Sequence, residues 1–195
     1  MMKKPLFLDV DGILVDWCKG AHEIHDVPYF GDGDRWPYAR GPAGWNFCRE
    51  LGIPVEDLFK GMGHEFWASL DWTADGKRIL EYCENIVGPL NVFLLTSPCS
   101  NPGTIEGRME WIRREMPEYA GRTIIATVDD GGNGCKRAIA RLGTVLIDDY
   151  DCNVDEWTHY DGLGLLYPRP WNSNHTVTDP MTWLTLRLNE VYGDQ

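Results

Sequence analysis

Residues 6–16 constrain the fold of this 195-residue chain most strongly, because a short apolar run ends there in two carboxylates. Alternate residues of a strand point to the same side, so Asp9 and Asp11 are expected to face the same way. Two such charges repel each other strongly unless a cation lies between them or one is protonated. Gly12 then permits a sharp turn and close approach of a ligand. Taken alone, the pair is equally compatible with aspartates that cap a helix.

The rest of the chain alternates predicted strands and helices. Apolar runs at 91–96, 123–128, 144–147 and 163–167 predict strands. Helices are predicted at 13–26, 74–87, 104–116, 135–142 and 154–159, with a last helix that has Asp179 as N-cap and Pro180 at its first position. This alternation predicts an α/β fold, with a Rossmann-like parallel sheet flanked by helices.

Residues 27–72 differ in composition from the remainder, because glycine, proline and aromatic residues are concentrated there. The segment contains short helical candidates at 45–51, 55–60 and 64–70 and no convincing strand. It is predicted to be a small, mostly helical cap, which leaves 1–26 and 73–195 as the core domain. Most of its aromatic side chains are expected to form its own core, and one or two at its edge are available for a planar ligand.

Charge and composition exclude several classes of protein. The net charge of -12 and the lack of a basic run argue against binding of a nucleic acid polymer. No apolar run is long enough to span a bilayer, and the N-terminal one is too short for a signal peptide, so a cytoplasmic protein is expected. The six scattered cysteines are expected to be reduced packing residues. His22 and His25 alone are a weak indication of a metal site.

Reactive side chains follow several of the predicted strands. In a parallel sheet the carboxyl ends of the strands lie at one edge, so residues far apart in sequence converge there. Each residue alone has a structural explanation, such as a helix cap, a turn or a solvated lysine, but their joint occurrence at strand ends favours a site. The set comprises Asp9, Asp11, Thr96, Ser97, Lys136, Asp148 and Asp149.

This set supports phosphoryl transfer through an aspartyl-phosphate. Asp9 is predicted to attack phosphorus, and Asp11 to protonate the leaving oxygen and then activate water. Mg²⁺ prefers hard oxygen ligands, and Asp9, Asp148 and the backbone carbonyl of Asp11 are predicted to bind it. Thr96 is predicted to hydrogen-bond the phosphoryl oxygens, and Lys136 to offset their charge.

These residues resemble the four motifs of the haloacid dehalogenase-like hydrolase superfamily, which often inserts a cap between its first and second motifs. More narrowly, the sequence resembles the 5'(3')-deoxyribonucleotidases, which dephosphorylate nucleoside monophosphates. The matching segments are 9–17, 66–70, 95–98, 110–112, 146–149 and 166–172. The resemblance implies that Trp17 lies against the nucleobase, that Ser97 contacts the phosphate and that Asp149 belongs to the substrate-binding residues. It also implies a homodimer, although the residues show no interface signature.

Two departures from the family pattern leave alternatives open. Lys136 is followed by Arg137 rather than lying in an Arg-Asp-Lys-like setting, and Tyr150 stands where some relatives have arginine. The cap matches poorly before Phe66. Three alternatives to a nucleotidase therefore remain. They are a phosphatase for another small phosphomonoester, a phosphatase for the 3'-phosphate of a polynucleotide, and a non-catalytic module that binds a phosphorylated metabolite.

Overall fold

The computed structural model describes residues 3–29, 31, 36, 38–42, 48, 52–54, 57–99, 101–127 and 135–193. Five parallel strands form one sheet in the order β3-β2-β1-β4-β5. The strands are β1 (Leu6–Leu8), β2 (Val92–Thr96), β3 (Thr123–Ile125), β4 (Val145–Asp148) and β5 (Leu163–Leu166). The central strand β1 pairs with both neighbours, so that Leu8 lies opposite Leu94 and Ile147. The predicted parallel α/β fold is confirmed.

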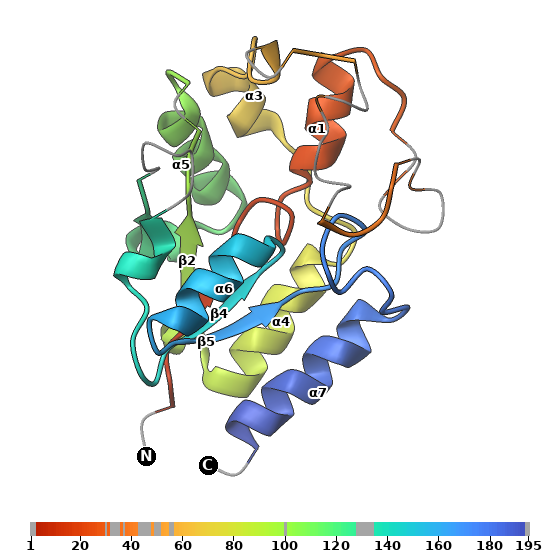
Figure 1. Ribbon diagram of the computed structural model, residues 1–195. Helices are drawn as coiled ribbons and strands as arrows, with labels where there is room; N and C mark the ends of the chain where they lie inside the picture. The colour runs from red at the N-terminus through yellow and green to blue at the C-terminus, as the bar shows by residue number, and fades with distance from the viewer. Residues whose placement is uncertain are drawn as a thin grey trace.

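Helices cover both faces of this sheet (Figure 1). The α-helices are α1 (Trp17–Ile24), α3 (His64–Ser69), α4 (Gly76–Val87), α5 (Thr104–Glu115), α6 (Asp151–His159) and α7 (Pro180–Tyr192). The 3₁₀ helices are η3 (Pro89–Asn91), η4 (Pro117–Arg122) and η5 (Cys135–Ala138).

Alternate residues of the strands enter two separate cores. Leu6 and Leu8 pack with the apolar faces of α4, α5 and α7, whereas Phe7 packs with Trp157 of α6 on the opposite face. Central strands buried on both faces are expected for a parallel sheet covered by helices, and they explain the continuous apolar run of β1. The last helix begins as predicted, because the Asp179 carboxylate accepts from the Thr182 amide and Pro180 occupies the first turn.

The described part of the cap region lies beyond the carboxyl ends of the strands (Figure 1). The chain leaves and re-enters the core side by side: the Asp16 amide donates to the Asp71 carbonyl and the Thr73 amide donates to the Leu14 carbonyl. Helix α1 lies next to α3, close enough that a Cβ on Gly20 would meet Leu70. This pairing favours a cap that starts near residue 16; the boundary at residue 26 stays a prediction.

Several element boundaries differ from those predicted, and three differences are the clearest. The helix expected from residue 13 begins at Trp17, the helix expected over 135–142 is the single 3₁₀ turn of η5, and β3 ends at Ile125. Parts of three predicted segments lie outside the described residues: 45–47 and 49–51 of one cap helix, 55–56 of the next, and the loop 129–134. In the described part of the chain, no helix is long and apolar enough to cross a membrane.

Candidate active site

The order of the strands creates a switch point at β1. From β1 the chain proceeds to β2 and β3 on one side, then returns to β4 and β5 on the other. Open α/β sheets bind ligands in the crevice at such a point, beyond the carboxyl ends of the strands. Asp9 directly follows β1, with its amide donating to the Ile147 carbonyl at 2.9 Å, and Asp148 is the last residue of β4. The two carboxylates therefore flank the crevice.

Lys136 links these two carboxylates. Its ammonium lies 2.6 Å from Asp9 Oδ1 and 2.7 Å from Asp148 Oδ2, and the residue is 1% exposed. Burial alone would lower the pKa of Lys136, but the charges of Asp148 and Asp9 outweigh it and hold the pKa above its ordinary value. The lysine that departs from the family setting is thus a buried cation paired with both carboxylates, and its role as the motif lysine stays a prediction.

Asp9, Asp148 and Asp149 form a buried acidic group whose carboxylate oxygens lie within 4.8 Å of one another. Burial is the largest cause that raises the pKa of Asp9 well above its ordinary value; Lys136 opposes it, and the other carboxylates reinforce it. Burial and the charge of Asp148 raise the pKa of Asp149 to about 7. Three hard oxygen donors under mutual repulsion fit a small divalent cation such as Mg²⁺.

Asp148 is held by further donors. Its Oδ1 accepts from the Tyr150 amide at 2.9 Å, and the Asn153 side-chain amide lies 3.0 Å and 3.2 Å from its two oxygens. Donors of this kind fix the direction of a carboxylate that would otherwise be repelled by its neighbours. Asn153 was not identified from the sequence, and its position three residues into α6 gave no signal.

Asp11 has a different set of partners from Asp9. Thr96 Oγ1 donates a long hydrogen bond of 3.5 Å to Asp11 Oδ2, and the guanidinium of Arg108, from α5, donates to Oδ1. Asp11 is thus on the side of the crevice formed by β2 and α5, whereas Asp149 completes the acidic group on the side of β4. Ser97, next to Thr96, has a buried hydroxyl with no hydrogen-bond partner among the described residues.

Residues near the C-terminus hold the loop that carries Asp11. Arg169 Nε donates to the Gly12 carbonyl at 2.8 Å, and its Nη2 is paired with Asp75 Oδ1 at 2.8 Å. Trp171 Nε1 donates to Asp149 Oδ2 at 2.7 Å. Gly12 itself has a φ of 77°, and a Cβ there would lie 2.1 Å from Asp149 Oδ2. The close approach therefore requires glycine.

Arg108 and Arg169 were not predicted from the sequence to belong to the site. The signal for Arg108 was its spacing, because it shares the apolar face of α5 with Trp111 and Ile112, where an arginine is out of place. The segment around Arg169 matched the family, but only as a sequence similarity without a role. Both arginines are at most 5% exposed.

Trp17, predicted to contact a nucleobase, is 8% exposed and belongs to the hydrophobic core, with its ring centroid 6.4 Å from that of Phe59. His22 is also buried, and its ring nitrogens are hydrogen-bonded to the Cys18 carbonyl and, at 2.7 Å, to the Tyr38 hydroxyl. These positions favour packing for both side chains.

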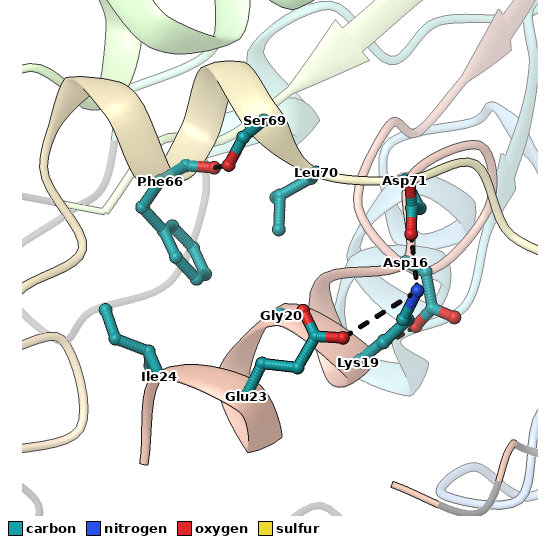
Figure 2. Close-up of a pocket in the computed structure, with 9 residues that line it drawn as sticks. All are labelled: Asp16, Lys19, Gly20, Glu23, Ile24, Phe66, Ser69, Leu70 and Asp71. Carbon is teal, nitrogen blue, oxygen red and sulfur yellow. Dashed lines mark hydrogen bonds and ion pairs between the residues drawn. The ribbon is translucent and has the colours of Figure 1, made fainter. Parts of the chain in front are cut away.

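A pocket of about 270 Å³ lies between α1 and α3 (Figure 2). Ile24 and Phe66 line one end of it, and Lys19 lies at the other end, where it is paired with Asp71 and, at 3.7 Å, with Glu23. Asp9, Asp148 and Asp149 do not line this pocket, and its lysine is already paired, so the pocket is separate from the switch-point site.

Comparisons with known proteins agree with this architecture. No family model matches the sequence, and no curated protein matches it significantly. Solved structures do match. A haloacid dehalogenase-like family hydrolase from Streptococcus pneumoniae aligns with a TM-score of 0.54 and 10% identity, over 95% of this chain and 99% of that one. A candidate phosphoglycolate phosphatase from Lactobacillus plantarum aligns with a TM-score of 0.50 and 17% identity, over 95% and 100%. The chain therefore has the fold of these hydrolases.

Proposed function

We propose that this protein is a phosphatase of the haloacid dehalogenase-like superfamily that hydrolyses a small phosphomonoester. The observation that carries the proposal is the convergence of Asp9, Lys136 and Asp148 from three separate segments at the switch point. The shared fold makes the catalytic edge of the sheet the expected place for the reaction, but chemistry has to be argued from the residues themselves.

The proposed reaction has two steps. A carboxylate oxygen of Asp9 forms a bond to phosphorus while the ester bond to the leaving oxygen breaks, and Asp11 supplies the proton to that oxygen. Asp11 then accepts a proton from water as the water oxygen attacks phosphorus, which releases phosphate and regenerates Asp9. Asp9 and Asp11 have separate partners, Lys136 for the first and Arg108 for the second, so each carboxylate is held independently.

Two polar groups are proposed to stabilise the phosphoryl oxygens. Thr96, at the end of β2 and 1% exposed, offers a hydroxyl next to Asp11. Lys136 offers a buried positive charge that stays within reach of Asp9. Donors fixed before the substrate arrives stabilise developing charge without reorganisation.

Mg²⁺ is proposed to bind to Asp9, Asp148 and the backbone carbonyl of Asp11. Asp149 lies beside Asp9 and Asp148 as a third buried carboxylate. When bound, the ion would neutralise these carboxylates and so reduce repulsion of an anionic phosphate. Lys136 already places one cation between Asp9 and Asp148, which shows how strongly this position favours positive charge.

Within the class of phosphomonoesters, a nucleoside monophosphate is the proposed substrate. The support is the resemblance to 5'(3')-deoxyribonucleotidases and the many aromatic residues beyond the carboxyl ends of the strands. A different small phosphomonoester is the second candidate, and the burial of Trp17 favours it because a buried ring offers little surface for stacking.

The first test is phosphate release from 5'- and 3'-monophosphates of ribo- and deoxyribonucleosides and from sugar phosphates, each with Mg²⁺ and with chelator. Asp9→Asn is expected to reduce turnover by at least a thousandfold, because the amide keeps the shape of the side chain but is no nucleophile. Asp155→Asn, an exposed aspartate of α6, serves as the matched control.

Metal-dependent release that requires Asp9 supports a phosphatase, and preference for deoxynucleotides supports the nucleotidase proposal. Release from sugar phosphates alone would retain the catalytic proposal and reject the nucleotide substrate. Near-normal activity of Asp9→Asn would contradict the aspartyl-phosphate mechanism.

A further inference from the structure

Arg108 is a buried cation with unused hydrogen-bonding capacity. It is 2% exposed, and its Nη2 donates to Asp11 Oδ1. Its guanidinium carbon lies 5.1 Å from the centroid of the Trp67 ring. Its other terminal nitrogen, Nη1, is also buried, yet it has no hydrogen-bond partner among the residues that the structure describes. Pairing with Asp11 thus accounts for only one end of the guanidinium.

Two helices hold Arg108 in this position. A Cβ on Gly107 would lie only 2.3 Å from the His64 carbonyl oxygen, so α3 approaches α5 very closely at the turn before Arg108. The Trp111 indole donates to the Leu70 carbonyl at 2.6 Å, and Arg114 donates to the Ala68 carbonyl at 2.6 Å. The face of Trp67 is therefore fixed against the guanidinium, a favourable arrangement for a desolvated cation.

An unpartnered buried donor is costly, because it loses its bonds to water without replacement. The Ser97 hydroxyl, at the adjacent end of β2, is a second buried polar atom without a hydrogen-bond partner in the described chain. Both atoms can donate, and both residues adjoin the pair formed by Thr96 and Asp11. Two unsatisfied donors on one side of the crevice indicate a ligand that accepts hydrogen bonds.

Two buried cations at the site, Lys136 and Arg108, favour an anionic ligand. Asp9, Asp148 and Asp149 are opposed by Lys136 on the β4 side. Arg108 supplies positive charge on the other side, next to Asp11. Arginine presents a planar fork of donors that matches phosphate oxygens, and its contacts with phosphate are among the stronger hydrogen bonds in proteins.

We propose that Arg108 is a substrate-binding residue that donates from Nη1 to a phosphoryl oxygen while Nη2 holds Asp11, the proposed acid, beside the same group. This inference rests on the proposed function and deepens it, because it places the phosphoryl group between Lys136 and Arg108. It also gives Trp67 a role: its ring orients the arginine and does not contact the substrate.

Arg108→Lys is the most informative variant. Lysine keeps a positive charge near Asp11, but one ammonium nitrogen replaces the two terminal nitrogens of the guanidinium, so separate nitrogens can no longer hold Asp11 and the phosphoryl oxygen. Arg113→Lys is the matched control, because Arg113 lies on the same helix with its side chain exposed. Binding of inorganic phosphate is measured by calorimetry in the presence of Mg²⁺, and KM and kcat are measured with a phosphomonoester that the wild type hydrolyses.

For Arg108→Lys we expect a dissociation constant for phosphate and a KM about tenfold above those of the wild type. Arg108→Gln, which also removes the charge, is expected to raise both by about a hundredfold. Arg113→Lys is expected to change them less than twofold. The melting temperature of each variant is compared with that of the wild type, and Arg108→Lys decides the question if Arg108→Gln fails to fold.

The outcomes separate this inference from the proposed function. If the wild type hydrolyses phosphomonoesters but Arg108→Lys binds phosphate and turns over like Arg113→Lys, the phosphatase stands and the role of Arg108 is wrong. If no phosphomonoester is hydrolysed but phosphate still binds and Arg108→Lys weakens it tenfold, the anion site stands and the proposed function is wrong.

Discussion

Lys136 shows how one side chain determines the electrostatics of this crevice. Its ammonium pairs with Asp9, which follows β1, and with Asp148, the last residue of β4, and thereby joins the two sides of the switch point. A buried ion pair of this kind contributes little net stability, but the loss of one partner leaves an uncompensated buried charge. The arrangement is therefore costly for the fold, and a role in chemistry is the simplest reason to keep it.

A prediction at the same scale concerns Trp17. If its ring supports a nucleobase, Trp17→Leu should raise KM for a nucleoside monophosphate about tenfold and leave KM for a small aryl phosphate nearly unchanged, because only the nucleotide offers a base for stacking. Steady-state kinetics with both substrates measure the difference. Trp183→Leu, on the distant helix α7, is the control.

Equal losses of activity on the two substrates would instead identify Trp17 as a packing residue, as its 8% exposure favours. Removal of part of a buried aromatic side chain also lowers the free energy of unfolding, by up to about 3 kcal/mol. Unfolding by denaturant therefore has to accompany the kinetics, so that a partly unfolded variant is not mistaken for one with weak binding.

At the scale of elements, the segment after β5 acts as a support for the loop after β1. Arg169 reaches the Gly12 carbonyl and pairs with Asp75 at the start of α4, and the Asn172 amide donates to the Asp149 carbonyl at 2.9 Å and to the Tyr167 carbonyl at 2.7 Å. A residue more than 150 positions away from Gly12 thus helps to set the geometry of the loop after β1.

The pairing of Asp75 with Arg169 predicts a pH dependence of stability. Burial would raise the pKa of Asp75, but the charge and hydrogen bonds of Arg169 and the Tyr167 hydroxyl lower it below its ordinary value of 3.8. The unfolded chain therefore binds more protons near that pH, so the stabilisation is complete above about pH 4 and disappears as the pH falls through the lower folded-state pKa.

Asp75→Asn should consequently lower the free energy of unfolding at pH 7 by about 3 kcal/mol, because Arg169 is left buried without its counter-charge. The deficit should shrink as the pH falls below 4. Urea unfolding of both proteins between pH 3 and pH 7 measures it. A deficit that is independent of pH would show that packing, rather than ionisation of Asp75, causes the loss.

Elements with strong local signals were predictable. The strands are apolar runs bounded by turn residues, and Asp179 with Pro180 marks the start of α7 by local hydrogen bonding alone. Helix α1 begins later than its apolar pattern indicates, because the amides of Leu14 and Val15 both donate to the Val10 carbonyl in a tight loop. That loop is stabilised by Arg169, so its shape depends on contacts that no local pattern contains.

The candidate site was predictable where its residues follow strands, because topology alone brings Asp9, Thr96 and Asp148 to one edge of the sheet. Arg108 and Arg169 reach the site from a helix face and a loop, so their roles depend on packing. The different surroundings of Asp11 and Asp149 also needed the structure, because both are aspartates next to a strand end, and their partners, Arg108 and Trp171, come from a helix and a loop elsewhere in the chain.

At the scale of the whole molecule, the buried carboxylates of the proposed site lower the stability of the folded protein. The pKa of Asp149 is raised to about 7, from an ordinary value of 3.8. Between these values the folded protein binds more protons than the unfolded chain, so stability falls as the pH rises from about 4 to about 7. At neutral pH the protein without metal is therefore less stable than it would be without this charge, a common cost of a functional site.

Asp149→Asn should then be more stable than the wild type in chelator at pH 8, by about 2–4 kcal/mol, because it removes a buried charge and retains an oxygen that can accept from Trp171. The exposed Asp155→Asn should show no such gain. Thermal unfolding at pH 8 and at pH 5 measures both, and the gain should decrease at pH 5, where Asp149 of the wild type is protonated.

Addition of Mg²⁺ should raise the melting temperature of the wild type more than that of Asp149→Asn, because the ion stabilises the folded state in proportion to its affinity. If Asp149→Asn is instead less stable than the wild type in chelator at both pH values, the hydrogen bond from Trp171 outweighs the repulsion between Asp149 and its neighbouring carboxylates. Mg²⁺ would then not be needed to relieve that repulsion.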